Sequence, residues 1–489
     1  MDQATLIASV VQEVVKRLGS AGGASAGGAK SPAAPSSSPV SAPASSGGTN
    51  DPATGRFASV DAAVEAATKA QDQLAAGGLN LRRGIVKLIK SIVKQNSKEW
   101  GKIEFDETKI GRLDHKVLKL ELLDNIPGVE FLTTRAHSGD SGIGLDEAAP
   151  WGVIGAITPV THSIPTLTAN AISMIAAGNS IVYNPHPSGA RCAAMAVEVY
   201  NKAIKAQFGV GPLLTIMDPP TLRTAEEIFQ HPGIPLLVVT GGPAVARAAM
   251  KQTKRAIVAG PGNPPVVVDE TADFDNAAKS IIAGASFDNN LLCIGEKEVF
   301  VVESVFDKMM DAMRRAGAVE LAAAAIQKLT DVAFTWAKDH YAVNKDYVGK
   351  DPSFLGKAVG LNIRDGVDLL FGETDESNPF VPEEQMMPFV PFIRAKNFEH
   401  ALAMAVKHEH GFGHTACIHS NNIKNITRMG QVMNTTLFAV NGPSTGCLGI
   451  GGEGYPSYSI ATPTGEGVTT PLTFTRFRRV TVSGGLRIV

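Results

Sequence analysis

The feature that most constrains the fold is a regular alternation of strands and helices that begins at Trp151. Short apolar runs, each the length of one buried strand, are separated by longer segments with the spacing of amphipathic helices. The expected strands cover residues 152–157, 180–183, 213–217 and 235–239, and the expected helices cover 166–177, 190–206 and 224–230. Such alternation is typical of a parallel, doubly wound sheet, in which ligands bind at the carboxyl ends of the strands. We therefore expect a nucleotide-binding α/β domain.

The same rhythm restarts after Pro261 and continues to about Gly465. A strand over 266–268, a helix over 277–287 and a strand over 299–302 predict a second α/β domain.

Outside these two regions the patterns differ. Apolar residues at helical spacing predict three helices ahead of Trp151, over 60–74, 82–95 and 116–132. The C-terminal end, from Thr473, is basic and then strand-like. A terminal strand with no following helix often pairs with the sheet edge of another subunit.

The first 56 residues have a composition of their own. Residues 1–20 carry one apolar stripe that includes Leu6, Val10 and Val14, and residues 21–56 are mostly Ala, Gly, Ser and Pro. That second composition predicts a flexible, disordered linker. A helix as short as the first segment is marginal in water without a partner surface. It could fold back on its own domain or pair with itself, but the long tether favours a docking helix for another protein.

Charge and cysteine content exclude several classes of protein. The net charge of −2 predicts no bulk attraction to nucleic acid or membranes, and the chain has no run of about 20 apolar residues for a membrane span. The four cysteines are far apart and match no zinc spacing, so we expect no metal site. This cysteine usage indicates a reducing, cytoplasmic location.

Cys293 is the first candidate for chemistry. It follows the expected helix over 277–287, precedes the strand over 299–302, and lies among small and amide-bearing residues. A lone cysteine in this setting could be a thiolate nucleophile. By itself, however, a single cysteine is more often a small buried hydrophobic residue.

Other candidates lie where expected strands end. Thr240-Gly241-Gly242-Pro243 follows a strand and opens a helix, so its backbone amides could bind a phosphate or simply form a tight turn. Asn184-Pro185-His186-Pro187 leaves the preceding strand on the same side of the sheet, as a ligand contact or a rigid loop. His162 and His414 could orient a substrate or stabilise their own loops.

Taken together, these segments resemble the aldehyde dehydrogenase family. The resemblance rests on Phe287-x-Asn289-x-x-x-Cys293, on 176–182, on Thr240-Gly241-Gly242 and on Glu383–Pro388. The segments 152–159, 184–187, 413–416, 441–444 and 463–467 resemble the CoA-acylating branch. Because of its amphipathic N-terminal segment and linker, the chain resembles the aldehyde dehydrogenases that are packed inside bacterial microcompartments.

The resemblance implies a fold and an organisation. It implies two doubly wound α/β domains, a β oligomerisation arm and a disordered N-terminal extension. The implied parts are a docking helix at 1–20, a linker at 21–56, a dinucleotide- and CoA-binding domain at 57–258, a catalytic domain at 259–465 and a C-terminal oligomerisation strand at 466–489, with 130–148 contributing to the arm. A homodimer or homotetramer is implied, with a shell protein as partner.

The resemblance also implies the site. The catalytic residues would be Cys293, Thr161, His162 and His414. The cofactor-binding residues would be Thr158, Pro159, Asn184, Pro185, His186, Pro187, Thr240, Gly241, Gly242, Pro243 and Glu384. The cofactor would be NAD, with NADP also possible because Asn184 and Pro187 replace the ribose-binding Lys and Glu of hydrolytic relatives.

The absence of one carboxylate predicts which acceptor takes the acyl group from Cys293. Hydrolytic members have a glutamate just before a glycine pair, whereas Val258–Pro264 contains no carboxylate. Without that base, attack of water on a thioester at Cys293 should be slow, while a CoA thiolate needs less activation. We therefore expect a short-chain aldehyde, CoA and NAD to give acyl-CoA and NADH. The alternatives are a hydrolytic dehydrogenase with another base, and a non-catalytic docking or scaffold protein.

Overall fold

The computed structural model describes residues 50–338 and 340–489. The predicted docking helix at 1–20 and nearly all of the predicted linker at 21–56 lie outside the described residues. Within the described part, no helix is both long and apolar enough to cross a membrane.

The first sheet contains all the strands expected between 152 and 239. Its order is β1-β6-β5-β4-β7-β8, and every neighbouring pair is parallel. The strands are β1 Arg56–Phe57, β4 Val153–Thr158, β5 Ser180–Pro185, β6 Leu214–Met217, β7 Leu236–Thr240 and β8 Arg255–Ala259. From β4 the chain first builds outward through β5 and β6 and then returns to add β7 and β8 on the other side. Crevices for ligands open at such switch points.

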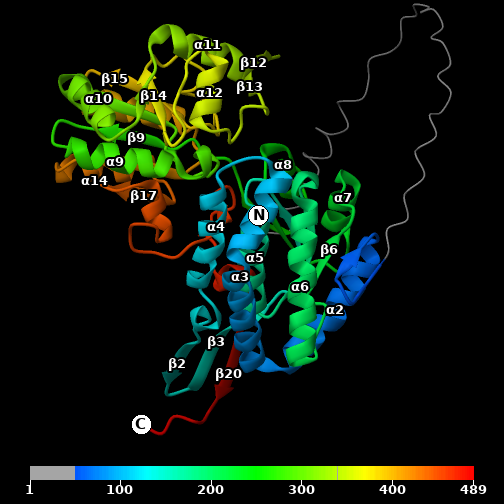
Figure 1. Ribbon diagram of the computed structural model, residues 1–489. Coiled ribbons are helices and arrows are strands. Elements are labelled where there is room, and N and C mark those ends of the chain that lie inside the picture. Colours follow the sequence, from blue (N-terminus) through cyan, green and yellow to red (C-terminus); the bar gives the residue numbers. More distant parts are fainter. Residues whose placement is uncertain (1–49, 339) are drawn as a thin grey trace, which may run out of the picture. The chain divides into compact units, whose positions relative to one another are not determined.

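Helices cover both faces of this sheet. Helices α3, α5 and α6 lie side by side over one face, where they share a core with β4 and β5 (Figure 1). Helices α2, α7 and α8 share a second core with the other face. The bounds are α2 Val60–Ala76, α3 Gly78–Thr108, α4 Leu113–Glu121, α5 Ser163–Ala176, α6 Ala190–Phe208, α7 Leu222–Gln230 and α8 Pro243–Met250.

Two of the expected helices have different lengths in the structure. The helix expected over 82–95 is α3, which has 31 residues because its buried face continues at helical spacing as far as Trp100. The helix expected over 116–132 ends at Glu121 and gives way to two short 3₁₀ turns. Ile126 is extended in this region because it precedes Pro127, and proline disfavours helical geometry in the residue before it.

The second α/β region contains a seven-stranded parallel sheet in the order β11-β14-β15-β10-β9-β16-β17. The strands are β9 Pro265–Val268, β10 Glu298–Val302, β11 Val319–Glu320, β14 Leu370–Glu373, β15 Phe389–Ala395, β16 Thr415–His419 and β17 Leu437–Val440. Helices α9 (Phe274–Ala285) and α10 (Phe306–Arg315) pack on one face. Helices α13 (Phe398–His408) and α14 (Ile423–Met433) pack on the other. The prediction of two doubly wound sheets is confirmed.

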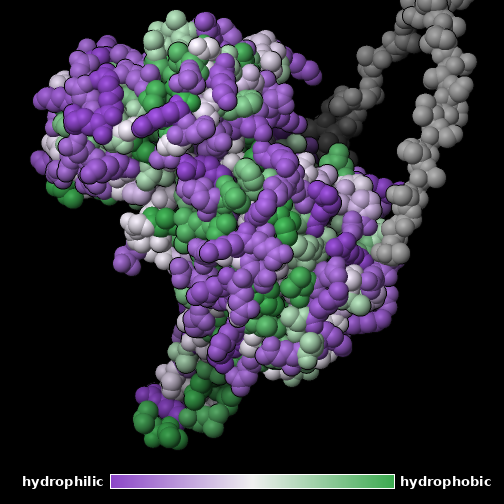
Figure 2. Space-filling view, in the orientation of Figure 1, coloured by the Kyte–Doolittle hydropathy of each residue, from purple (hydrophilic) through white to green (hydrophobic). Residues whose placement is uncertain are grey.

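A third, antiparallel sheet joins distant parts of the chain. Strand β3 (Gly142–Pro150) pairs with β2 (Arg135–Gly139) on one side and with β20 (Thr475–Ser483) on the other. The predicted terminal strand therefore pairs within its own chain, and an outer edge of β20 remains. Figure 2 shows hydrophobic surface at the tip of this sheet, near the C-terminus. The exposed apolar residues of β20 and the segment after it include Phe477, Val480, Val482 and Leu486. Its use as an oligomerisation arm stays a prediction.

Asn179 connects three elements of the first domain. Its Oδ1 accepts hydrogen bonds from the backbone N–H groups of Trp151 and Gly152, at 2.7 and 3.1 Å. Its Nδ2 donates to the carbonyls of Met174 and Phe474, at 3.2 and 3.0 Å. The start of β4, the end of α5 and the C-terminal segment thus meet at one fully buried amide.

We expect Asn179→Ala to lower the free energy of unfolding by about 3 kcal/mol, because it leaves several buried backbone groups unpaired. The urea midpoint should fall while the slope of the transition is unchanged. Asn80→Ala is the control: this exposed amide accepts only from Arg83, and its loss should cost less than about 0.5 kcal/mol. Equal effects of the two substitutions would contradict this role for Asn179.

Candidate active site

All the predicted cofactor residues except Glu384 lie at the carboxyl edge of the first sheet, whereas Glu384 precedes β15 of the second. Thr158 and Pro159 end β4, the Asn184–Pro187 segment ends β5, and Thr240–Pro243 ends β7. The backbone N–H of His186 donates to the carbonyl of Thr158 at 3.0 Å, so the first two segments are in direct contact. Because β4 lies between β5 and β7, all three segments border the switch-point crevice.

Within the 184–187 segment the side chains differ in availability. The Asn184 amide is used inside the domain, since its Oδ1 accepts from Thr224 Oγ1 at 2.6 Å and its Nδ2 donates to the Thr221 carbonyl at 3.3 Å. Pro185 is buried in β5, whereas His186 and Pro187 are exposed. Only the last two are therefore open to a ligand.

Two features of this edge fit the phosphates and ribose of a nucleotide. Gly242 precedes α8, and a Cβ placed on it would meet nothing within 4 Å, so an anion has room beside the helix N-terminus. The Thr158 hydroxyl is buried without a hydrogen-bond partner among the described residues. An unpaired buried hydroxyl is costly unless a ligand or water completes it. These residues fit a dinucleotide or the nucleotide end of CoA.

Two of the four predicted catalytic residues, Cys293 and His414, lie at the amino edge of the second sheet. Gly262, Cys293, Glu384 and His414 each precede one strand, β9, β10, β15 and β16 respectively, and these four strands are adjacent in the order β15-β10-β9-β16. A Cβ placed on Gly262 would lie 2.4 Å from the Cys293 carbonyl oxygen and 3.2 Å from His414 Nδ1. Glycine at 262 thus allows the cysteine backbone and the imidazole to approach from two sides.

Cys293 lies, partly buried, in the loop between α9 and β10. It packs against an apolar cluster that includes Leu292, Leu448 and Ile460, with Cys447 also in contact with that cluster. Burial, and next the negative charge of Glu384, raise the pKa of the Cys293 thiol to about 12, against the opposing charge of Lys297. In this state Cys293 is a neutral thiol that needs a base to become a nucleophile.

His414 is a fully buried imidazole beside this cysteine loop. Its Nδ1 lies 2.8 Å from Thr415 Oγ1, and its Nε2 has no partner among the described residues. Burial, and then the charge of Lys297, lower the pKa of His414 to about 4. The ring is therefore neutral at physiological pH and a weak base, and its Nε2 can take a proton when Nδ1 carries the hydrogen shared with Thr415 Oγ1.

The cysteine loop has an unusual backbone. Asp288, Asn289 and Asn290 all have left-handed φ values, of 51°, 56° and 64°. Asp and Asn tolerate this region better than other residues with side chains. The Asn289 amide stabilises the turn by donating to the Gly349 carbonyl at 3.0 Å and to Asp351 Oδ1 at 2.8 Å. The helix expected over 277–287 consequently ends at Ala285, and the loop turns toward Cys293.

Thr161 and His162 follow β4 and lie against buried charged groups that sequence reasoning missed. Lys116 and Lys119 of α4 are fully buried, and both ammonium groups donate to the Thr161 carbonyl, at 2.8 and 3.3 Å. A signal was present in the sequence, because Lys116 and Lys119 share the spacing of the buried Leu120 and Leu123.

A second missed group is Glu296, three residues after Cys293. Its carboxylate accepts from the Ser444 N–H at 2.8 Å and from Ser444 Oγ at 2.9 Å, in the 3₁₀ turn Ser444–Leu448. Burial raises the pKa of Glu296 to about 7 in spite of these bonds. This contact joins the cysteine loop to the segment that carries Cys447.

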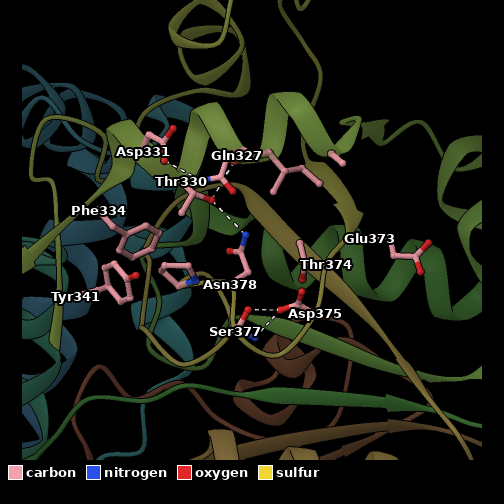
Figure 3. Close-up of a pocket in the computed structure, with 13 residues that line it drawn as sticks. Gln327, Thr330, Asp331, Phe334, Tyr341, Glu373, Thr374, Asp375, Ser377 and Asn378 are labelled. Atoms are coloured by element: carbon pink, nitrogen blue, oxygen red, sulfur yellow. Dashed lines mark hydrogen bonds between the residues drawn. The ribbon is translucent and has the colours of Figure 1, made fainter.

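Figure 3 shows a separate pocket in the second α/β region. It lies between α11 (Ala323–Ala333) and the turn after β14, and its lining includes Thr330 from the helix and Asp375 and Asn378 from the turn. None of the predicted site residues lines it. Among residues 50–338 and 340–489, no group of three or more His, Cys, Asp or Glu could hold a metal ion.

The raised pKa of Cys293 predicts how the ligand-free protein reacts with iodoacetamide. Alkylation requires the thiolate, so its rate should rise about tenfold per pH unit from pH 7 to 10 without a plateau. Peptide mass spectrometry separates Cys293 from the partly exposed Cys447, and Cys293→Ala supplies the blank. A plateau below pH 8 would show a thiolate that already exists in the ligand-free protein and would contradict this description.

Known proteins share both the sequence and the fold. Residues 32–454 match the aldehyde dehydrogenase family model. The chain is 44% identical over 439 residues to an acetaldehyde dehydrogenase (acetylating), EutE, of Salmonella typhimurium, covering 89% of this chain and 94% of that protein.

Two solved structures are similar throughout. A propionaldehyde dehydrogenase from a fucose-utilisation bacterial microcompartment of Clostridium phytofermentans has a TM-score of 0.86 and 38% identity, covering 89% of this chain and 100% of that one. A propionaldehyde dehydrogenase of Rhodopseudomonas palustris, solved with bound CoA and an acylated cysteine, has a TM-score of 0.85 and 38% identity, covering 88% and 98%. With a family model that spans most of its length, this chain belongs to the aldehyde dehydrogenase family.

Proposed function

We propose that this protein is a CoA-acylating aldehyde dehydrogenase that converts a short-chain aldehyde, NAD and CoA into acyl-CoA and NADH. The observation that carries the proposal is the surroundings of Cys293. The segment that passes against its backbone, 258–264, contains no carboxylate, and the group across Gly262 is the neutral imidazole of His414. The acetylating and CoA-bound relatives support the same reaction.

The first half of the reaction makes a thioester on the protein. His414 takes the thiol proton of Cys293 through its unpaired Nε2, and the sulfur attacks the aldehyde carbon to give a thiohemiacetal. The Cys293 N–H and groups around Thr161 stabilise the oxyanion. Thr158, Pro159 and Thr240–Pro243, at the carboxyl edge of the first sheet, would hold NAD, which when bound would supply the acceptor for the hydride on that carbon. The carbon is thereby oxidised to an acyl thioester of Cys293.

The second half transfers the acyl group. The CoA thiol gives its proton to His414 and attacks the thioester carbonyl, and the departing Cys293 sulfur takes that proton back to become a thiol. Water would need a carboxylate base of the kind missing from 258–264, so CoA competes successfully for the thioester. We assign the nucleotide ends of NAD and CoA to the same crevice, with Thr158, Pro159, His186, Pro187 and Thr240–Pro243 as its residues.

Glu384 does not lie in the segment 258–264, where hydrolytic relatives have the glutamate that acts as the base. Its charge acts on Cys293, and burial raises the pKa of its own carboxyl group, with Lys297 and the Gly262 N–H opposing the shift. We assign it to the ribose next to the nicotinamide, in line with the family resemblance of its segment. It is also the carboxylate that a hydrolytic reaction would have to use.

Steady-state kinetics test the proposed reaction. Wild-type protein with acetaldehyde or propionaldehyde and NAD should form NADH at least about 10²-fold faster with CoA than without it, because water lacks a base. Cys293→Ala should form neither NADH nor acyl-CoA. Full NADH formation without CoA, with release of free acid, would establish the hydrolytic alternative instead, and persistent activity in Cys293→Ala would exclude the cysteine mechanism.

We also propose that residues 1–20 dock the enzyme to the shell of a bacterial microcompartment. The support is the apolar stripe of Leu6, Val10 and Val14 on a segment tethered by a long linker, together with the microcompartment origin of a relative. Encapsulation would place the enzyme in the cytoplasm, inside such a compartment.

Deletion of residues 1–20 should leave kcat of the free enzyme unchanged and abolish co-sedimentation with purified shells. The matched control is the full-length double variant Val10→Glu/Val14→Glu, which keeps the length but breaks the stripe and should behave like the deletion. Co-sedimentation of both variants at the wild-type level would exclude docking through this segment.

A further inference from the structure

Lys119 connects the two halves of the active site. Its ammonium group lies 2.5 Å from Asp288 Oδ2 in the cysteine loop, 3.0 Å from His162 Nδ1 and 3.3 Å from the Thr161 carbonyl oxygen. Asp288 belongs to the second α/β region, whereas Thr161 and His162 follow β4 of the first. Lys119 and Asp288 are fully buried and His162 is 6% exposed, so these contacts are shielded from solvent.

An ammonium group has three hydrogens and no lone pair. The three contacts of Lys119 therefore use all its donors, and each partner must accept. For His162 this means that Nδ1 carries the lone pair, which puts the ring proton on Nε2. No residue in the described ranges forms a hydrogen bond with that Nε2–H group.

The charges around Lys119 are consistent with this assignment. Burial lowers the pKa of Lys119 to about 8, against the opposing charge of Asp288, so the group is mostly an ammonium at neutral pH. Burial and the charges of Lys119 and Lys116 lower the pKa of His162 far below its ordinary value, although Asp288 and the Thr161 backbone oppose them. An ammonium ion next to a neutral imidazole is the state that these groups favour.

Lys116 completes the cluster without touching His162. Its ammonium group lies 3.1 Å from Glu104 Oε1 and 3.6 Å from Asp288 Oδ2, and it donates to the Thr161 carbonyl. Glu104 Oε2 in turn accepts from the Ile164 N–H at 3.0 Å. Two lysines and two carboxylates balance each other, which makes the buried cluster tolerable.

We propose that Lys119 is a positioning residue: it ties the cysteine loop to the Thr161–His162 loop and holds His162 as the Nε2–H tautomer, which donates to the oxygen of the bound aldehyde. The residues on either side of Cys293 in the sequence, Leu292 and Ile294, have apolar side chains and cannot supply this hydrogen-bond donor. The residue before Lys119 also lies near the site, because Leu118 packs against the same apolar cluster as Cys293. The catalytic part of this inference rests on the proposed function, whereas the tautomer does not.

The first test reads the tautomer in the resting full-length enzyme, with no substrate. Selective ¹⁵N-histidine labelling and NMR separate a protonated ring nitrogen from an unprotonated one, and His162→Gln assigns the His162 signals. Wild-type protein should show His162 protonated on Nε2 only. Protonation on Nδ1 in the wild type would overturn the proposal without any variant.

The second test removes the lysine. The double variant Lys119→Met/Asp288→Asn avoids a buried unpaired carboxylate, so it is the form designed to fold. Its His162 signals should shift to a mixture of both tautomers. The matched control Lys116→Met/Glu104→Gln should keep the Nε2–H form, because Lys116 does not contact the ring and the variant also leaves no unpaired carboxylate. An unchanged His162 in Lys119→Met/Asp288→Asn would overturn the proposal.

The third test measures catalysis. Removal of one oxyanion donor typically lowers kcat about 10²-fold, and we expect a loss of that size in kcat of Lys119→Met/Asp288→Asn with little change in the KM for CoA. A raised KM for CoA with an unchanged kcat would overturn the positioning role. Failure of the proposed function would look different, since wild-type protein would then show no CoA-dependent activity while the tautomer result stood.

Discussion

A left-handed turn of three residues, held by buried polar groups, is the constraint on which the active site depends. Three successive residues with positive φ are each strained by roughly 1 kcal/mol or more, and Asp288, Asn289 and Asn290 keep this geometry because their side chains are tied down. Asn289 donates to the backbone near Gly349, and Asp288 accepts from Lys119 and from the Arg112 N–H at 2.9 Å. The turn directs the chain toward Cys293 instead of letting α9 continue.

The position of this turn matters because the two sheets present opposite edges to the reaction. The first sheet offers its carboxyl edge, where helix N-termini and loops suit the phosphates of a nucleotide. The second offers its amino edge, where the segments that enter β15, β10, β9 and β16 bring Glu384, Cys293, Gly262 and His414 together. Lys119 and Asp288 connect the two edges through buried contacts. In the proposed reaction, this arrangement lets NAD and CoA bind in turn in one crevice while the acyl group stays on Cys293.

The sequence was a good guide to the fold and a partial guide to the site. Strands β4, β5, β6, β7, β9 and β10 were predictable because buried parallel strands are continuous apolar runs bounded by turns. The edge strand β8 (Arg255–Ala259) was missed. The extent of α3 was underestimated because polar residues interrupt a face that stays apolar as far as Trp100. The convergence of Cys293, Glu384 and His414 could not be derived from spacing, since it depends on the order of strands in the second sheet. Buried lysines were missed because the rule that charges lie outside fails where carboxylates compensate them, as Asp288 and Glu104 do.

The central claim is that the acyl group waits on Cys293 for CoA. Intact-protein and peptide mass spectrometry measure this directly, after the enzyme is mixed with acetaldehyde and NAD in the absence of CoA. The account predicts one acetyl group on Cys293 per chain, discharged at least about 10²-fold faster when CoA is added than by water alone. An acetyl group that never accumulates, or that leaves as free acetate at the same rate with and without CoA, would contradict the account.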